Sequence, residues 1–231
     1  MSPQKHQNRK HQRKIDYLSA IDKKYYIFCE GQQTEPLYFD AFKKAIKANP
    51  MYKNAVHVEV TGVGAETLRV IYYAKDYVHQ NKLKNAEIWC VYDKDSFPNQ
   101  DFNAVSMYAE TLNQEQEDVR YRVAWSNQCI EYWFILHFDW YTADNDRKYY
   151  RTYLHKKFAE FGYKRYEKNN PELFDILTKY GNPKQAIQYA KRRLSECSGC
   201  TDSDSVPATK VHLLVMSLAE YLPDDLKKQY I

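Results

Sequence analysis

The chain has 231 residues and a formal net charge of +4, with 44% hydrophobic and 28% charged residues. This composition allows one large globular domain, and no apolar run reaches the roughly 18 residues of a membrane helix, which excludes a membrane-spanning protein. No apolar stretch follows the first charges, so we expect no secretory signal, no membrane partner and a cytoplasmic location.

Residues 1–20 are predicted to form a basic, flexible arm. Between Met1 and Lys14 lie five Lys or Arg residues and two His residues, and no acidic residue. Such a segment cannot bury enough apolar surface to fold by itself. Its uniform positive charge favours contact with nucleic acid.

Strands and helices alternate along residues 21–140. We expect strands at 25–29, 56–60, 87–92 and 120–125, and helices at 35–48, 65–81 and 101–118. Short apolar runs indicate the strands, and apolar residues spaced for one face indicate the helices. Thr34 is positioned to cap the first helix. Helical crossovers between strands predict an α/β core with a mainly parallel four-stranded sheet flanked by helices.

From Cys129 onward the sequence predicts helices and loops. The expected helices span 129–138, 144–161, 171–180, 183–196 and 207–221, and residues 198–206 form a polar loop. We expect residues 141–231 to form a helical portion that packs on the α/β core.

Three carboxylates follow predicted strands at the points where the strands end. Glu30 follows the first strand, and Asp93 and Asp95 follow the third. Parallel strands end at one edge of a sheet, so these side chains should converge, and a divalent cation would relieve their mutual repulsion. Carboxylate oxygens without thiolates suit Mg²⁺ or Mn²⁺. Each residue also has a structural explanation, since Asp is common in turns and a polar residue often ends a strand.

Two further carboxylates are candidates for the same site. Glu35 lies in a helix's first turn, where it would interact with the helix dipole or serve as a further metal ligand. Glu131 lies in the apolar segment 129–138 and, once buried, needs a partner. That partner is either a nearby Arg, a backbone cap or the metal.

The stretch 144–168 is basic and contains five tyrosines. Basic side chains follow phosphates and aromatic faces stack on bases, although an ordinary amphipathic helix with Tyr on its core face has the same pattern. Together with a second basic cluster near residue 192, the candidate nucleic-acid-binding residues are Arg147, Lys148, Arg151, Lys156, Lys157, Arg192 and Arg193.

Four collinear segments resemble the RloB family, which is Toprim-like and is encoded beside restriction and other phage-defence systems. The segments are CEGQQTEPLYF at 29–39, VYDKDSF at 91–97, SNQCIEYWFILHF at 126–138 and PATKVHLLV at 207–215. The Glu-Gly and Asp-x-Asp elements also resemble the Toprim pattern of topoisomerases, primases and overcoming-lysogenization-defect nucleases.

The resemblance implies a nuclease that uses Mg²⁺ or Mn²⁺. Glu30 would act as general acid–base or metal ligand, and Asp93 and Asp95 would hold the metal. Glu35 lies near a further acidic position of those nucleases, although the spacing between Glu30 and this acidic residue is one residue longer here. We therefore expect Glu30, Asp93, Asp95 and Glu131 to be catalytic, and Glu30, Glu35, Asp93 and Asp95 to bind metal.

Two alternatives to a nuclease of DNA or RNA remain at this point. The first is a non-catalytic or partner-dependent nucleic-acid-binding subunit that works with an ATPase, since the chain itself has no P-loop signature. The second is a haloacid-dehalogenase-type phosphatase, which also has Asp-x-Asp after a strand. That family normally has this motif on its first strand and carries Thr or Val where this chain has Phe97. Whether identical chains associate stays open.

Overall fold

The structure is a computed structural model that describes residues 22–231. The predicted basic arm at residues 1–20 lies outside the described residues. No helix in the described part of the chain combines the length and apolar character that crossing a bilayer requires.

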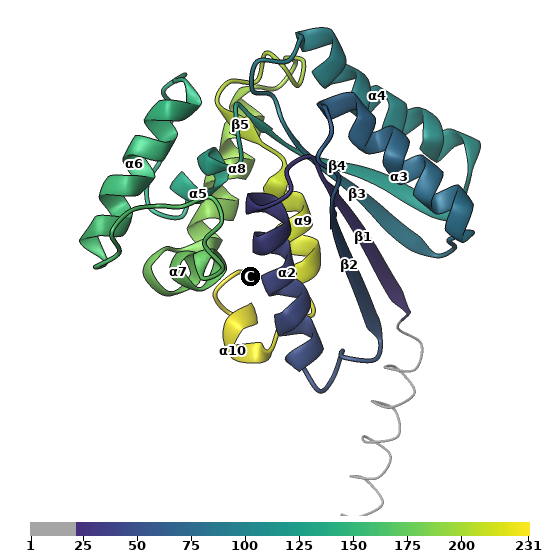
Figure 1. Ribbon diagram of the computed structural model, residues 1–231, viewed down its shortest axis with the longest axis horizontal. Coiled ribbons are helices and arrows are strands. Elements are labelled where there is room, and N and C mark those ends of the chain that lie inside the picture. Colours follow the sequence, from purple (N-terminus) through teal and green to yellow (C-terminus); the bar gives the residue numbers. More distant parts are fainter. Residues whose placement is uncertain (1–21) are drawn as a thin grey trace, which may run out of the picture.

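A five-stranded sheet forms the centre of the described structure (Figure 1). Its spatial order is β2 (Val56–Gly62), β1 (Lys23–Cys29), β3 (Ala86–Asp93), β4 (Val119–Asn127) and β5 (Ala208–Thr209). The first four strands are parallel, and β5 pairs antiparallel with β4. The α/β class with a mainly parallel sheet is confirmed. The predicted number of four strands is wrong, because a two-residue strand is too short to show a periodic pattern.

Helices cover both faces of this sheet (Figure 1). One face packs against α3 (Thr67–Asn81) and α4 (Asn99–Glu115). The other face packs against α2 (Thr34–Ala48), and the C-terminal helices lie on this same side of the sheet. These are α5 (Glu131–Ile135), α6 (Arg147–Glu160), α7 (Leu173–Tyr180), α8 (Pro183–Glu196), α9 (Val211–Ala219) and α10 (Asp224–Lys227).

The apolar run of β1 is explained by burial on both sides. Tyr25, Ile27 and Cys29 face α2 and the C-terminal helices, whereas Tyr26 and Phe28 face α3. Side chains alternate between the faces of a strand, so a strand covered on both sides is apolar at every position. The continuous apolar sequence follows from this two-sided core.

Three local predictions need correction. Thr34 is the first residue of α2, and no side chain caps the helix, because a capping residue must precede the first helical one. The helix predicted at 129–138 is only the five-residue α5, with turns on either side. The helix predicted at 207–221 is α9, which begins at Val211, because the preceding residues join the sheet as β5.

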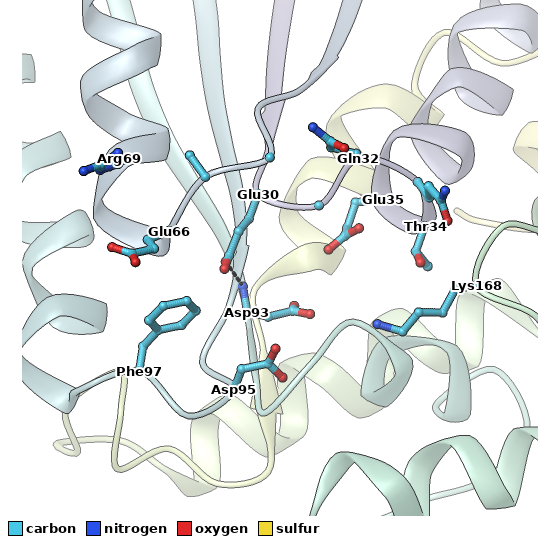
Figure 2. Close-up of a pocket in the computed structure, with 14 residues that line it drawn as sticks. Glu30, Gln32, Thr34, Glu35, Glu66, Arg69, Asp93, Asp95, Phe97 and Lys168 are labelled. Carbon is cyan, nitrogen blue, oxygen red and sulfur yellow. Dashed lines mark hydrogen bonds between the residues drawn. The ribbon is translucent and has the colours of Figure 1, made fainter.

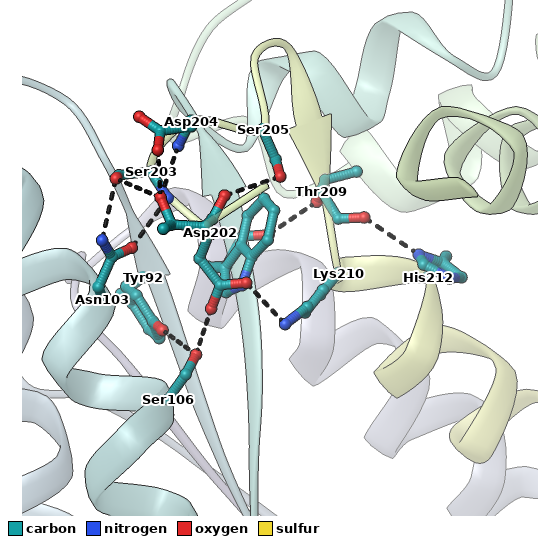
Figure 3. A network of polar contacts seen from close by, with 12 residues as sticks. Tyr92, Asn103, Ser106, Asp202, Ser203, Asp204, Ser205, Thr209, Lys210 and His212 are labelled. Carbon is teal, nitrogen blue, oxygen red and sulfur yellow. Dashed lines mark hydrogen bonds and ion pairs between the residues drawn. The ribbon is translucent and has the colours of Figure 1, made fainter. Parts of the chain in front are cut away.

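A polar network fixes the loop before β5 to α4 (Figure 3). Asp202 accepts a hydrogen bond from Ser106 on α4 and pairs with Lys210, whose Nζ lies 2.8 Å from Asp202 Oδ1. Asn103 and Ser203 exchange two hydrogen bonds of 2.9 and 3.0 Å. The loop is therefore held by side chains from the core.

The direction of the helical connections creates a crevice at one edge of the sheet. The chain leaves β1 toward α2 on one face, and it leaves β3 toward α4 on the other. Neighbouring strands whose connections diverge in this way form a topological switch point, where open α/β sheets bind ligands. The carboxyl ends of β1 and β3 meet there.

Candidate functional site

Glu30 and Asp93 lie together at the switch point between β1 and β3 (Figure 2). Glu30 directly follows β1, and its N–H donates to the Val91 carbonyl at 2.8 Å. The N–H of Asp93, the last residue of β3, donates to Glu30 Oε2 at 3.0 Å. The backbone of two adjacent parallel strands therefore sets the position of both residues.

Asp95 and Glu35 lie near Glu30 and Asp93, and they come from a turn and from a helix. Asp95 lies in the turn after β3 with φ of +39°, a left-handed conformation that Asp adopts more readily than most residues. Glu35 is in the first turn of α2 and is only 6% exposed. Its carboxylate lies against Gly31, where any Cβ atom would collide with it. Glycine at this position makes room for the buried carboxylate.

All four predicted metal ligands line one pocket of about 710 Å³. Figure 2 shows Glu30, Asp93, Asp95 and Glu35 around it, with Lys168 on the side of Glu35. The loops that enter α2 and α3 complete the wall. The structure thus brings together residues that lie up to 65 positions apart in the sequence, from Glu30 to Asp95.

Burial and mutual repulsion make Glu30, Glu35 and Asp93 hard to ionise. Burial, with smaller contributions from the charges of Glu35 and Asp95, raises the pKa of Glu30 to about 7. Burial, together with the charge of Glu131, raises the pKa of Glu35. Burial raises the pKa of Asp93 well above its ordinary value, and four neighbouring carboxylates add to the effect. The cluster therefore favours bound protons or a bound cation.

The donor chemistry of the pocket fits a hard divalent cation. Asp93 Oδ1 and Asp95 Oδ1 are buried and have no hydrogen-bond partner among residues 22–231. Carboxylate oxygens are the ligands that Mg²⁺ and Mn²⁺ prefer. The arrangement is not yet a coordination shell, since no three His, Cys, Asp or Glu side chains in the described chain are grouped to hold an ion. Ion binding would require side chains of the cluster to rotate.

Two carboxylates at this edge are paired with cations from the C-terminal half. Arg147 Nη1 lies 2.6 Å from Asp95 Oδ2. Glu131 is fully buried, and its Oε1 accepts from Arg151 at 3.2 Å and from Tyr166 at 3.3 Å. Of the alternatives for Glu131, the structure contains the pairing with Arg. Glu131 does not line the pocket, but its charge raises the pKa of Glu35 and Asp93, which do.

A family model described as RloB-like protein matches residues 25–218. The chain belongs to the RloB-like family. The match includes all four sequence segments that carry the resemblance, and the five-stranded sheet is compatible with a Toprim-like fold. No curated protein and no solved structure matches the chain.

The other basic residues on α6 of this RloB-like protein do not line the carboxylate pocket. Lys148 Nζ is 5.2 Å from the centre of the Tyr149 ring, and Lys156 is exposed. Lys157 pairs with Glu160 at 3.1 Å. Their proposed contact with nucleic acid stays a prediction.

Arg192 and Arg193 on α8 make different contacts. Arg192 lies over the Trp140 ring, 4.6 Å from its centre, and pairs with Glu196 at 3.0 Å. Arg193 donates to the carbonyls of Val206 and Pro207 at 2.7 and 2.9 Å. Arg193 therefore supports the loop before β5 of the RloB-like protein, and a role in nucleic-acid binding remains a prediction for both residues.

Lys168 and Thr67 are among the polar residues at the site that sequence reasoning missed. Lys168 lines the pocket, and its Nζ lies 3.8 Å from Glu131 Oε1. The Thr67 hydroxyl on α3 lies 3.5 Å from both Glu30 Oε2 and the Asp93 carbonyl. Lys168 stands in the basic stretch 144–168, but nothing in its local sequence separates it from the other lysines there. Thr67 is the first residue of an amphipathic helix, and a hydroxyl residue is ordinary at a helix start.

Proposed function

We propose that this RloB-like protein is a metal-dependent, Toprim-like nuclease that hydrolyses phosphodiester bonds in DNA or RNA. The main support is that Glu30, Glu35, Asp93 and Asp95 line one pocket at the switch point of the sheet. Buried carboxylates with raised pKa values destabilise a protein unless a cation compensates them, so their concentration in one pocket is better explained by function than by stability.

Glu30, Asp93 and Asp95 would hold the Mg²⁺ or Mn²⁺ ion, and Glu35 is available for a second. When bound, the ion would polarise a phosphodiester oxygen and lower the pKa of a bound water. In its alternative role as general base, Glu30 would not bind the ion, and its pKa of about 7 would suit proton exchange at neutral pH. Lys168 faces the pocket with a positive charge that would stabilise the charge developing on the phosphate.

A second candidate function is a nucleic-acid-binding subunit that depends on an ATPase partner. It is favoured by the ion pair of 2.6 Å between Arg147 and Asp95, which occupies one proposed metal ligand. A partner that moves α6 would release this carboxylate. For both candidates, the family resemblance supports a role in phage defence.

The test compares cleavage by the purified full-length protein and by Asp93→Asn. Plasmid, linear DNA and tRNA are each incubated with Mg²⁺ or Mn²⁺. We expect cleavage of at least one substrate, and a loss of at least about 100-fold in the variant. The matched control is Asp118→Asn, since Asp118 is an exposed acid just before β4, at the other edge of the sheet.

The outcomes of this test distinguish the two candidate functions. Cleavage that survives Asp93→Asn, or that is unaffected by EDTA, would contradict the metal-dependent nuclease. Cleavage lost equally in Asp118→Asn would point to a fault in folding. Cleavage that appears only when a candidate ATPase partner and ATP are added would support the partner-dependent candidate.

A further inference from the structure

A second, smaller pocket of about 280 Å³ continues from the carboxylate pocket along α3. The two pockets share Glu66, Arg69 and Phe97 as lining residues, and the smaller one adds Tyr72 and Asp101. Figure 2 shows Phe97 beside the carboxylates, on the side opposite to Lys168. A ligand whose phosphate lies at the carboxylates can therefore extend directly into the smaller pocket.

The side chains of the smaller pocket match a nucleobase rather than a phosphate. Tyr72 is 46% exposed, and its ring is held edge-on against Tyr108 at a centroid distance of 5.2 Å. Phe97 provides a second aromatic ring, and aromatic rings in nucleic-acid channels stack on bases. Glu66 and Asp101 repel phosphate, but they can accept hydrogen bonds from the amino groups of bases.

Arg69 stands at the boundary between the two pockets. It is exposed and forms no ion pair with a carboxylate between residues 22 and 231. A guanidinium at this position suits a phosphate of the nucleotide whose base occupies the smaller pocket. The carboxylates, Arg69 and the aromatic rings are thus arranged to contact, respectively, the scissile phosphate, a neighbouring phosphate and the base of one nucleic-acid strand.

We propose that Tyr72 and Phe97, with Arg69 at the entrance, form an aromatic subsite that binds one unstacked nucleobase next to the scissile phosphate. The proposal rests on the nuclease function proposed above and specifies its substrate class. The faces of a base inside a duplex are covered by its neighbours, so only an unpaired or extruded base can enter. The substrate is therefore single-stranded nucleic acid or a duplex with an exposed base.

The test measures binding in the Asp93→Asn background, which keeps the nucleic acid intact. Fluorescent single strands of DNA and RNA, the matching duplexes, and single strands with abasic positions are titrated in Mg²⁺. We expect Tyr72→Ala and Phe97→Ala each to weaken single-strand binding by about fivefold to 150-fold. Tyr72→Phe, which keeps the ring, should bind like the parent.

Tyr73→Ala is the matched control. Tyr73 neighbours Tyr72 on α3 and is 43% exposed, but it lines neither pocket. The abasic strand should bind weakly to the parent and should be insensitive to Tyr72→Ala, because its missing base has nothing to stack.

The outcomes separate this proposal from the nuclease proposal. If the parent binds single strands and Tyr72→Ala and Phe97→Ala behave like Tyr73→Ala, the subsite is refuted and the nuclease proposal stands. If the two substitutions weaken binding of intact and abasic strands equally, stacking is likewise refuted. If the parent binds neither single strands nor duplexes, both proposals fail.

Discussion

Replacing Glu30 with glutamine should stabilise the metal-free protein at alkaline pH. The pKa of Glu30 is raised from 4.5 to about 7, chiefly by burial and then by the neighbouring carboxylates. Between these values the folded protein keeps a proton that the unfolded chain has lost. The free energy of unfolding therefore falls as pH rises from about 4.5 through about 7.

The size of the effect follows from the pKa values. A rise from 4.5 to about 7 costs about 3 kcal/mol above pH 7, at about 1.4 kcal/mol per pKa unit. Glutamine has no charge to lose, and its carbonyl still accepts the hydrogen bond from the Asp93 N–H. Glu30→Gln should therefore raise the melting temperature by roughly 6 to 12 °C at pH 8, and by little at pH 5.

Thermal denaturation of both proteins between pH 5 and 8, in EDTA and in Mn²⁺, checks this prediction. The metal should stabilise the wild type more than Glu30→Gln, because the variant lacks one ligand. Glu117→Gln is the control, since Glu117 is exposed and precedes β4 at the other edge of the sheet. A wild-type melting temperature in EDTA that does not fall between pH 5 and 8 would refute the reasoning, as would equal stability of the variant at pH 8.

Three further substitutions test the charged groups around the pocket. Arg147→Ala should tighten Mn²⁺ binding by up to about fivefold in calorimetry, because it frees Asp95 from an ion pair that is partly exposed; unchanged affinity would contradict this. Glu131→Ala should lower the free energy of unfolding in urea by about 1 to 3 kcal/mol, since Arg151 and the Tyr166 hydroxyl lose their acceptor; a loss below about 1 kcal/mol would show that these contacts are unimportant. Lys168→Ala should slow cleavage by about 100-fold with little change in stability, because its side chain is 47% exposed; normal cleavage would remove Lys168 from the site.

The parts of the fold that local chemistry determines were predictable from the sequence. The helix predicted at 183–196 is α8 with the same bounds, because Asn182 caps it and Pro183 starts it. The meeting of Glu30 and Asp93 was also predictable, since parallel strands bring their carboxyl ends to one edge. The joint position of two strand-end carboxylates therefore carried more information than either residue alone.

The pairings across the two halves of the chain were not predictable. Whether Glu131 binds Arg, a cap or metal depends on how α6 packs against α5, and no local pattern encodes that contact. Arg147 stands 52 residues from Asp95, and it resembles the other basic residues of α6 in sequence. β5 was not predicted for a related reason. Its two residues form a strand only because they pair with β4.

The same pairings bear on how the proposed nuclease would be controlled. Asp95 cannot serve fully as a metal ligand while Arg147 lies 2.6 Å from it. The phosphate of a bound nucleic acid offers Arg147 another anion, so substrate binding would free Asp95 for the metal. Metal affinity should then rise when nucleic acid is present, and linkage requires nucleic-acid affinity to rise equally with metal. In Arg147→Ala this coupling should weaken, because Asp95 is already free and only the direct contact between the ion and the phosphate remains.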